Sequence, residues 1–198
     1  MTTADPIDVA VSVAAVFEAL GVPYVLGGSL ASTIHGEGRA TYDVDFAADL
    51  GLDKAFDFSA RLRHVFYVDE EMIREAAARG GHFNLVHLPT YTKVDVYVRR
   101  SVGFHASEFA RARRMRLRTD PEGFARVASA EDTVIQKLYW FREGGEVSDR
   151  QWRDVLGVIK ANGERLDMAY LREWARQRDL KRFLDRALRE SGWSQPSD

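Results

Sequence analysis

Strand-like and helix-like segments alternate along the first hundred or so residues, and this alternation constrains the fold more than any other feature. The segments "YVLGG", "YDVDFAA" and "TKVDVYV" have the apolar or alternating character of strands, and helix-like segments separate them. After about residue 128 only helical patterns follow. We therefore expect an α/β (α+β) domain over residues 1–128, with a small mixed sheet and flanking helices, and a C-terminal helical bundle over residues 129–198 packed on it.

The composition is typical of a globular chain and excludes several kinds of site. Hydrophobic residues make up 45% of the chain and charged residues 29%, with a formal net charge of −2. The absence of cysteine excludes disulfides, zinc–thiolate sites and thiol nucleophiles. The N-terminal segment contains Asp5, Asp8 and Glu18, which favours an amphipathic helix over a signal peptide. No segment is apolar enough to span a membrane, so we expect a soluble cytoplasmic protein without a membrane partner.

Two aspartates flank a valine in "YDVDF", and a third aspartate lies in "KVDVYV". Alternate residues of a strand share a face, so Asp43 and Asp45 are expected side by side, with Val44 and Phe46 toward the core. Neighbouring carboxylates are unfavourable without a cation between them, and oxygen ligands suit Mg²⁺ or Mn²⁺. If the strand of Asp95 is adjacent, the three acids predict a two-metal site for phosphoryl or nucleotidyl transfer. The alternative is that they are solvent-facing residues of a half-exposed strand.

A glycine-rich turn lies thirteen residues before these aspartates. Gly27 and Gly28 follow a strand and precede a short helix, where a missing side chain lets the backbone approach a ligand. We expect Ser29 to be the N-cap of that helix, whose N-terminus attracts anions such as a triphosphate. Arg39 is a candidate phosphate ligand or an ordinary surface arginine. The alternative for the glycines is an ordinary strand-to-helix turn.

The order of these motifs resembles that of the nucleotidyltransferase superfamily of the DNA polymerase beta kind. The longer pattern "GGSLAS…HGEGRATYDVDF", with "KVDVYV" and "EDTVIQKL…SDRQWRDVLGVI", is similar to the abortive-infection (AbiEii-like) nucleotidyltransferases, over roughly residues 20 to 160. Some of these proteins are toxins of toxin–antitoxin pairs. The resemblance implies a nucleotidyltransferase fold, phosphate contacts at Gly28 and Ser29, and metal binding by Asp43 and Asp45. For Asp95 the resemblance implies one of two roles: metal binding, or activation of the acceptor hydroxyl as a general base.

The resemblance also implies a catalytic lysine and a catalytic aspartate on two later helices. Lys137 matches the lysine and shares a helix side with Val134 and Phe141, so its ammonium group either points into a cleft or snorkels into water. Asp154, at the margin of a buried helix stripe, is the better match for the aspartate, and Asp149 is the alternative. An acid in the first helical turn, as Asp149 is, also stabilises the helix N-terminus by itself.

The segment "RARRMRLR" contains five arginines within residues 111–118. Over residues 99–118 there are seven arginines and one acid, Glu108. Such a run can guide a phosphate backbone such as that of tRNA. The alternative is a solvated face whose charges pair with acids elsewhere in the chain.

Three hypotheses follow for the function. The first is a Mg²⁺- or Mn²⁺-dependent nucleotidyltransferase that transfers NMP from an NTP such as ATP to a hydroxyl of RNA, a protein or a small molecule. The arginine run favours RNA such as tRNA, and the toxin-like pattern adds a cognate antitoxin as a partner. The second is a non-catalytic protein of the same fold that binds nucleotide or a partner protein. The third, a phosphohydrolase, lacks the expected His–Asp clusters.

Overall fold

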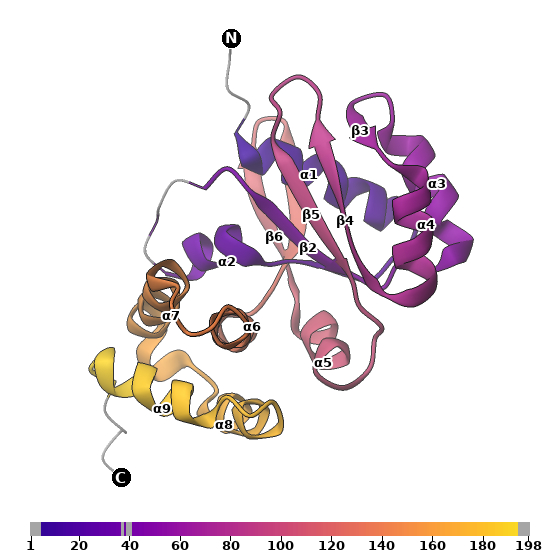
Figure 1. Ribbon diagram of the computed structural model, residues 1–198. Coiled ribbons are helices and arrows are strands. Elements are labelled where there is room, and N and C mark those ends of the chain that lie inside the picture. The colour runs from indigo at the N-terminus through magenta and orange to yellow at the C-terminus, as the bar shows by residue number, and fades with distance from the viewer. Residues whose placement is uncertain (1–4, 37, 39–40, 194–198) are drawn as a thin grey trace. The chain divides into compact units, whose positions relative to one another are not determined.

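The computed structural model describes residues 5–36, 38 and 41–193 (Figure 1). The chain forms two compact units, the first made of residues up to 30 together with 41–128, and the second of 31–40 together with the residues from 129 onward. Helix α2 (Gly28–His35) continues from the first unit into the second. In the part of the chain that is described, no helix combines the length and hydropathy required to cross a bilayer.

The first unit is built on a mixed sheet. Its described residues form seven strands in the order β3-β4-β5-β2-β1-β7-β6. The strands are β1 (Tyr24–Leu26), β2 (Val44–Ala48), β3 (Phe66–Val68), β4 (Gly81–His87), β5 (Lys93–Val98), β6 (Arg113–Thr119) and β7 (Glu122–Val127). Strand β2 pairs with β5 in parallel and with β1 in antiparallel orientation. The mixed α/β fold that the sequence predicts is confirmed.

One face of this sheet is covered by helices and carries the core. Helices α1 (Pro6–Ala19), α3 (Leu52–Leu62) and α4 (Glu70–Arg79) pack on the sheet, as Figure 1 shows. The ring of Phe17 from α1 lies 4.8 Å from that of Phe58 on α3 and 5.6 Å from that of Phe46 on β2, and all three are buried. Because side chains alternate along a strand, the opposite face of β2 and β5 receives the polar residues.

Residues 99–128 form three elements that the sequence pattern did not predict. They are α5 (Gly103–Arg111) and the antiparallel pair of β6 and β7. Strand β6 is an edge strand that contains most of the arginine run, and its two apolar residues, Met115 and Leu117, are only partly buried. Charged residues are common on edge strands because they discourage pairing with another chain.

The second unit is helical, as the sequence predicts. Its described helices are α6 (Ala130–Glu143), α7 (Asp149–Asn162), α8 (Met168–Gln177) and α9 (Lys181–Glu190), with a short 3₁₀ turn at Gly163–Arg165. Ser129 caps α6 by accepting a hydrogen bond from the Asp132 N–H at 3.0 Å, and Ser148 caps α7 by accepting one from the Gln151 N–H at 3.3 Å. Serine is a favoured N-cap residue, so both helix starts follow from the sequence.

Two phenylalanines of α3 provide a test of the first unit's core. Phe58 is 0% exposed, whereas Phe56 on the same helix is 67% exposed. We expect Phe58→Ala to lower the free energy of unfolding by about 3–5 kcal/mol, because it leaves a cavity in the aromatic cluster. Phe56→Ala is the matched control and should change it by less than about 0.5 kcal/mol. Urea denaturation followed by circular dichroism measures both, and equal losses would contradict the packing described.

Candidate active site

Two of the predicted acids meet on the polar face of the sheet. Asp45 on β2 and Asp95 on β5 are register partners in the parallel pair. Neighbouring strands lie about 4.8 Å apart and partners share a face, so the two side chains project side by side. Both are partly buried, whereas Asp43 is exposed and lies one residue before β2, which begins at Val44 rather than at Tyr42 as predicted. The structure thus brings together Asp45 and Asp95, with Asp43 two residues before the first of them.

A lysine supplies positive charge beside these acids. The ammonium nitrogen of Lys93 lies 2.8 Å from Oδ1 of Asp95. This hydrogen bond is the main cause that raises the pKa of Lys93, and the negative charges of Asp95 and, more weakly, Asp43 add to it. Within the described residues, no three histidine, cysteine or acidic side chains form a group arranged to hold a metal ion. A cation that binds Oδ1 of Asp95 would compete with the Lys93 ammonium group.

Further residues lie on this face, and the sequence analysis assigned them no functional role. The pKa of Tyr97 is raised first by burial and then by the negative charges of Asp45 and Asp95. Asn84 on β4 is the register partner of Asp95 on its other side. The alternation in "TKVDVYV" already placed Lys93 and Tyr97 on the face of Asp95. Asn84 gave no such signal, because a sequence does not reveal which strand lies beside which.

The glycine turn lies directly against one of the acids. Gly28 has a φ of +56°, and a Cβ atom built on it would lie 1.9 Å from Oδ2 of Asp45. The N–H of the preceding Gly27 donates to the Asp45 carbonyl at 2.9 Å. Both the backbone conformation and the available space therefore require glycine at position 28. Because α2 begins at Gly28, the buried Ser29 lies inside its first turn, and the prediction that Ser29 is the N-cap is wrong. Arg39 lies outside the described residues.

The predicted lysine and aspartate of the second unit contact each other. The Lys137 ammonium group on α6 donates to Oδ2 of Asp154 on α7 at 2.8 Å. Their exposed fractions are 5% and 9%, so Lys137 does not snorkel into water. Asp149 is exposed and is the first residue of α7, where it stabilises the helix N-terminus.

Most of the arginine run pairs with acids of the first unit. The contacts are Arg114 with Glu18, Arg116 with Glu122 and Arg118 with Asp8. The Arg114 guanidinium also lies 3.8 Å from the centre of the Phe124 ring. These contacts favour the alternative in which the run is a solvated, charge-paired edge of the sheet.

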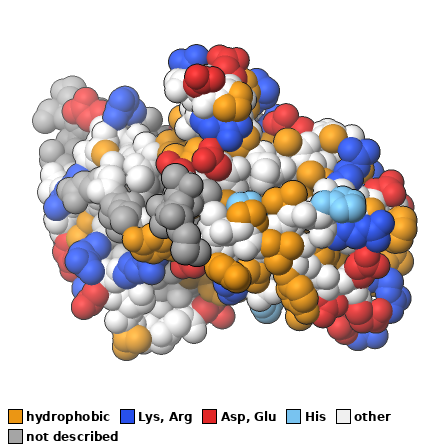
Figure 2. Space-filling model, turned by 90° about the horizontal axis from the view of Figure 1, so that it is seen from above, with side chains coloured by type: hydrophobic (Ala, Val, Ile, Leu, Met, Phe, Trp, Pro, Cys, Tyr) orange, Lys and Arg blue, Asp and Glu red, His pale blue; other side chains and the backbone are white. Residues whose placement is uncertain are grey.

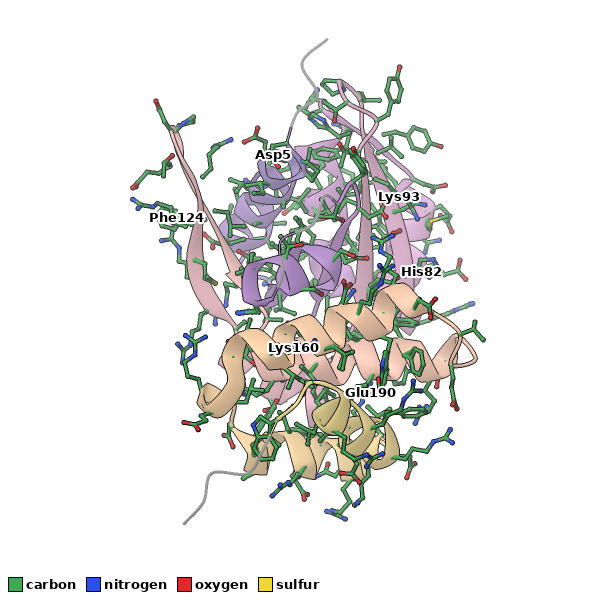
Figure 3. All side chains as sticks on the ribbon, turned by 90° about the vertical axis from the view of Figure 1, so that its left-hand side faces the viewer. Asp5, His82, Lys93, Phe124, Lys160 and Glu190 are labelled. Carbon is green, nitrogen blue, oxygen red and sulfur yellow. The ribbon has the colours of Figure 1, made fainter. Side chains whose placement is uncertain are left out.

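Space-filling and stick views show how the side chains are distributed over the structure. Figure 2 shows charged side chains of both signs interspersed with apolar ones on the face seen there, with no large area of one sign. Figure 3 shows Lys93 and His82 on the same side of the sheet of the first unit. The ring of His82 lies 5.8 Å from that of Tyr97, its register partner. The polar face therefore continues from the acids along β4 and β5.

Comparison with solved structures identifies proteins of similar fold. No protein-family model and no curated protein matches the chain. An antigenic nucleotidyltransferase-like protein from Paracoccidioides brasiliensis has a similar solved structure, with a TM-score of 0.55, 17% identity and 94% coverage of each chain.

The antibiotic-resistance factor ANT(2″)-Ia in solution matches with a TM-score of 0.55 and 14% identity, covering 93% of this chain and 98% of the other. Its complex with adenylyl-2″-tobramycin matches with a TM-score of 0.54 and 13% identity, over 88% and 98% of the two chains. The fold is thus that of nucleotidyltransferase-like proteins.

Gly28→Ala tests the close packing of the turn against Asp45. We expect it to lower the free energy of unfolding by at least about 1 kcal/mol, because a side chain at positive φ is strained and the new methyl group must displace the Asp45 carboxylate. Gly27→Ala is the control, since a Cβ atom there meets nothing within 4 Å. Thermal denaturation measures both variants. A Gly28→Ala variant as stable as Gly27→Ala would contradict this geometry.

The ion pair between Lys137 and Asp154 can be tested by removing one partner and then both. Lys137→Met and Asp154→Leu should each lower the free energy of unfolding by about 3–5 kcal/mol, because each leaves a buried charge uncompensated. The double variant should recover much of that loss, since it leaves no buried charge. Urea denaturation of the three variants gives the coupling, and additive losses would show that the two groups do not interact.

Proposed function

We propose that the chain is a nucleotidyltransferase that transfers an NMP group from an NTP, such as ATP, to a hydroxyl acceptor. The observation that carries this proposal is the register pairing of Asp45 and Asp95, with the backbone of Gly28 against the Asp45 carboxylate. A strand-to-helix turn beside paired acids suits a substrate that combines phosphates with a divalent cation. The fold shared with nucleotidyltransferase-like proteins supports the same activity.

The acids of this face offer the type of ligand that a divalent cation would need, although they are not arranged as a complete metal site among the described residues. Asp45 and Asp95, together with Asp43, offer the carboxylate oxygens that Mg²⁺ and Mn²⁺ prefer. The ammonium group of Lys93 beside Asp95 indicates that these acids attract positive charge. When bound, such an ion neutralises charge on the transferred phosphoryl group.

The chain's own residues would act on the substrate and the acceptor. Gly27, Gly28 and Ser29 lie where the NTP phosphates would approach the first turn of α2, and Arg39 is a further candidate phosphate ligand. Asp95, once released from Lys93, would accept the proton of the acceptor hydroxyl. The hydroxyl oxygen then attacks the α-phosphorus, and pyrophosphate leaves with the electrons of the broken P–O bond.

Lys137 and Asp154 enter this proposal through the motif resemblance. Their mutual ion pair gives each of them a fixed position inside the second unit. That contact supports a role in the stability of the helical unit in addition to the catalytic role proposed.

Two acceptor classes have support. RNA, such as tRNA, is favoured by the arginine run, although three of its five arginines contact acids. A small hydroxylated molecule is favoured by the structural likeness to ANT(2″)-Ia, which is described in complex with adenylyl-2″-tobramycin. A toxin role, with a cognate antitoxin protein as partner, rests on the AbiEii-like motif pattern.

One labelling experiment tests the activity and separates the acceptors. The protein is incubated with each α-³²P-labelled NTP and Mg²⁺, together with total tRNA, with tobramycin, or with no added acceptor. We expect labelled product with one of them, and Asp45→Asn and Asp95→Asn should each reduce its rate by about 100-fold or more. Asp57→Asn, an exposed acid on α3, is the control and should leave the rate unchanged.

The outcomes distinguish the hypotheses. Label on RNA or on tobramycin identifies the acceptor, and label on the protein itself indicates self-modification. Intact NTP binding without transfer to any acceptor would support the non-catalytic nucleotide-binding protein instead. Equal rates for Asp45→Asn and Asp57→Asn would refute the site.

A further inference from the structure

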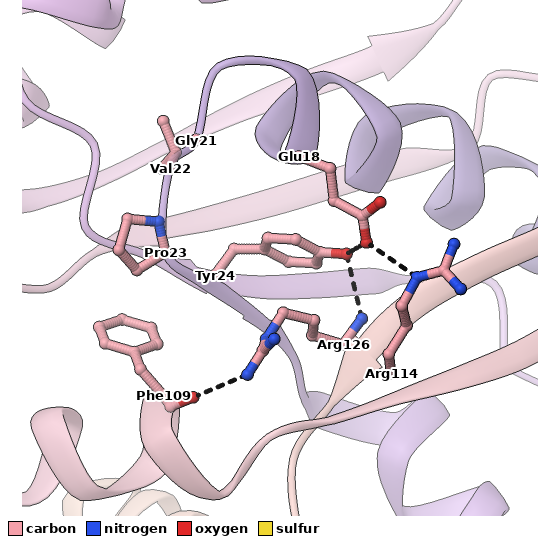
Figure 4. Close-up of a pocket in the computed structure, with 8 residues that line it drawn as sticks. All are labelled: Glu18, Gly21, Val22, Pro23, Tyr24, Phe109, Arg114 and Arg126. Atoms are coloured by element: carbon pink, nitrogen blue, oxygen red, sulfur yellow. Dashed lines mark hydrogen bonds and ion pairs between the residues drawn. The ribbon is translucent and has the colours of Figure 1, made fainter.

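The first unit contains a pocket beside the start of β1, whereas the glycine turn follows the end of that strand (Figure 4). Its volume is about 470 Å³, which lies in the range of small-molecule sites. The end of α1, the turn over residues 21–23, the start of β1, and single residues of α5, β6 and β7 line it. None of its lining residues belongs to the proposed active site.

Two arginines of this pocket are in an unfavourable arrangement. Arg114 on β6 and Arg126 on β7 are register partners in the antiparallel pair. Like charges directly opposite each other in such a pair repel. Glu18 compensates Arg114, whose Nε lies 3.8 Å from its carboxylate. Among the described residues no carboxylate pairs with Arg126, so its charge is offset only by backbone carbonyls.

One nitrogen of the Arg126 guanidinium group donates hydrogen bonds to the protein, and its other nitrogens are available as donors to a ligand. Its Nη2 donates to the carbonyls of Phe109 at 3.4 Å and Ala112 at 3.0 Å, at the C-terminal end of α5. No partner for its Nε or Nη1 occurs in the described part of the chain. Because the group is already oriented, an arriving oxyanion would find fixed donors at a small cost in side-chain entropy.

An apolar wall lies beside this guanidinium. Figure 4 shows Arg126 extended toward Phe109 and Pro23, whereas Arg114 lies at the side of Glu18. Phe109 and Val22 are 7% and 4% exposed, so packing holds them in place, and the neighbouring Pro23 is exposed. The pocket thus has an arginine and an apolar wall at one end and a charge-paired acid at the other.

Glu18 is held in place by a chain of two hydrogen bonds that runs through Tyr24. It accepts one from the Tyr24 hydroxyl at 3.0 Å, and that hydroxyl accepts one from the Arg126 backbone N–H at 3.0 Å. Burial is the main cause that raises the pKa of Tyr24, so the hydroxyl keeps its proton and its donor role. With one acid and two arginines, the lining has a net charge of +1, which suits a small anion better than a triphosphate.

We propose that this pocket binds a small organic oxyanion, a carboxylate or a phosphate monoester, with Arg126 holding the anionic group and Phe109 and Pro23 contacting an apolar, ring-sized body. This site is separate from the proposed active site and does not depend on the transferase activity. Its ligand class follows from the arginine without a carboxylate partner, the adjacent apolar wall and the volume.

The test is an NMR titration of the full chain with three probes that share a ring. Benzoate and phenyl phosphate carry the two oxyanions, and benzyl alcohol is the neutral control. We expect saturable shifts of the Tyr24 and Arg126 amides with at least one anion and none with benzyl alcohol. Arg126→Gln should weaken that binding by about tenfold or more, since it removes a charged hydrogen-bond donor. The stronger probe identifies the oxyanion.

Two further variants keep the proposal falsifiable. Glu18→Gln preserves the hydrogen bond from Tyr24 but removes the acid, and it should tighten anion binding by about twofold to threefold. Arg116→Gln, on the neighbouring strand β6 and outside the pocket, should leave the affinity unchanged. No saturable shift up to about 10 mM, or equal shifts with benzyl alcohol, would overturn the proposal. If Arg126→Gln does not fold, an unchanged affinity in Glu18→Gln overturns it.

Discussion

Two carboxylates on adjacent parallel strands, Asp45 and Asp95, repel each other, and the rest of the polar face is arranged around that repulsion. Lys93 provides a positive charge beside Asp95, and the hydrogen bond to that acid raises the pKa of Lys93, so this place stabilises a cation. Lys93 is half exposed, so its ammonium group can move into water when another cation approaches. A site of this kind favours a substrate that brings its own divalent cation with its phosphates.

The same acid also determines the shape of the neighbouring backbone. The carboxylate of Asp45 occupies the space that a side chain at position 28 would need, and the positive φ of Gly28 turns the chain into α2 at that point. The turn and the acid are therefore one structural unit rather than two motifs that happen to be close. Glycine is required at position 28 both by conformation and by space, which explains the second glycine of "GG".

Local patterns in the sequence predicted what local forces determine. The alternation in "TKVDVYV" identified the buried valines and the polar face of β5, and the serine caps of α6 and α7 followed from their side chains alone. The position of Asn84 beside Asp95 depends on strand order, which is set by packing of distant segments. The arginine-rich β6 was missed because its four arginines outnumber its two apolar residues, and Lys137 became interpretable only once its contact with Asp154 was known.

Charge compensation connects three of the places where this chain puts ionic groups in unfavourable surroundings. Lys137 and Asp154 lie in the interior of the second unit, and they satisfy each other directly, so their burial needs no ligand. Asp95 is compensated by a partly exposed lysine that can leave. Within the residues that the structure describes, Arg126 is compensated only by backbone carbonyls, which carry partial charges. A charged group that is incompletely compensated within the chain gains more from binding an ion or ligand of the opposite charge. We therefore expect ligands at the two sites of the first unit rather than at the buried ion pair.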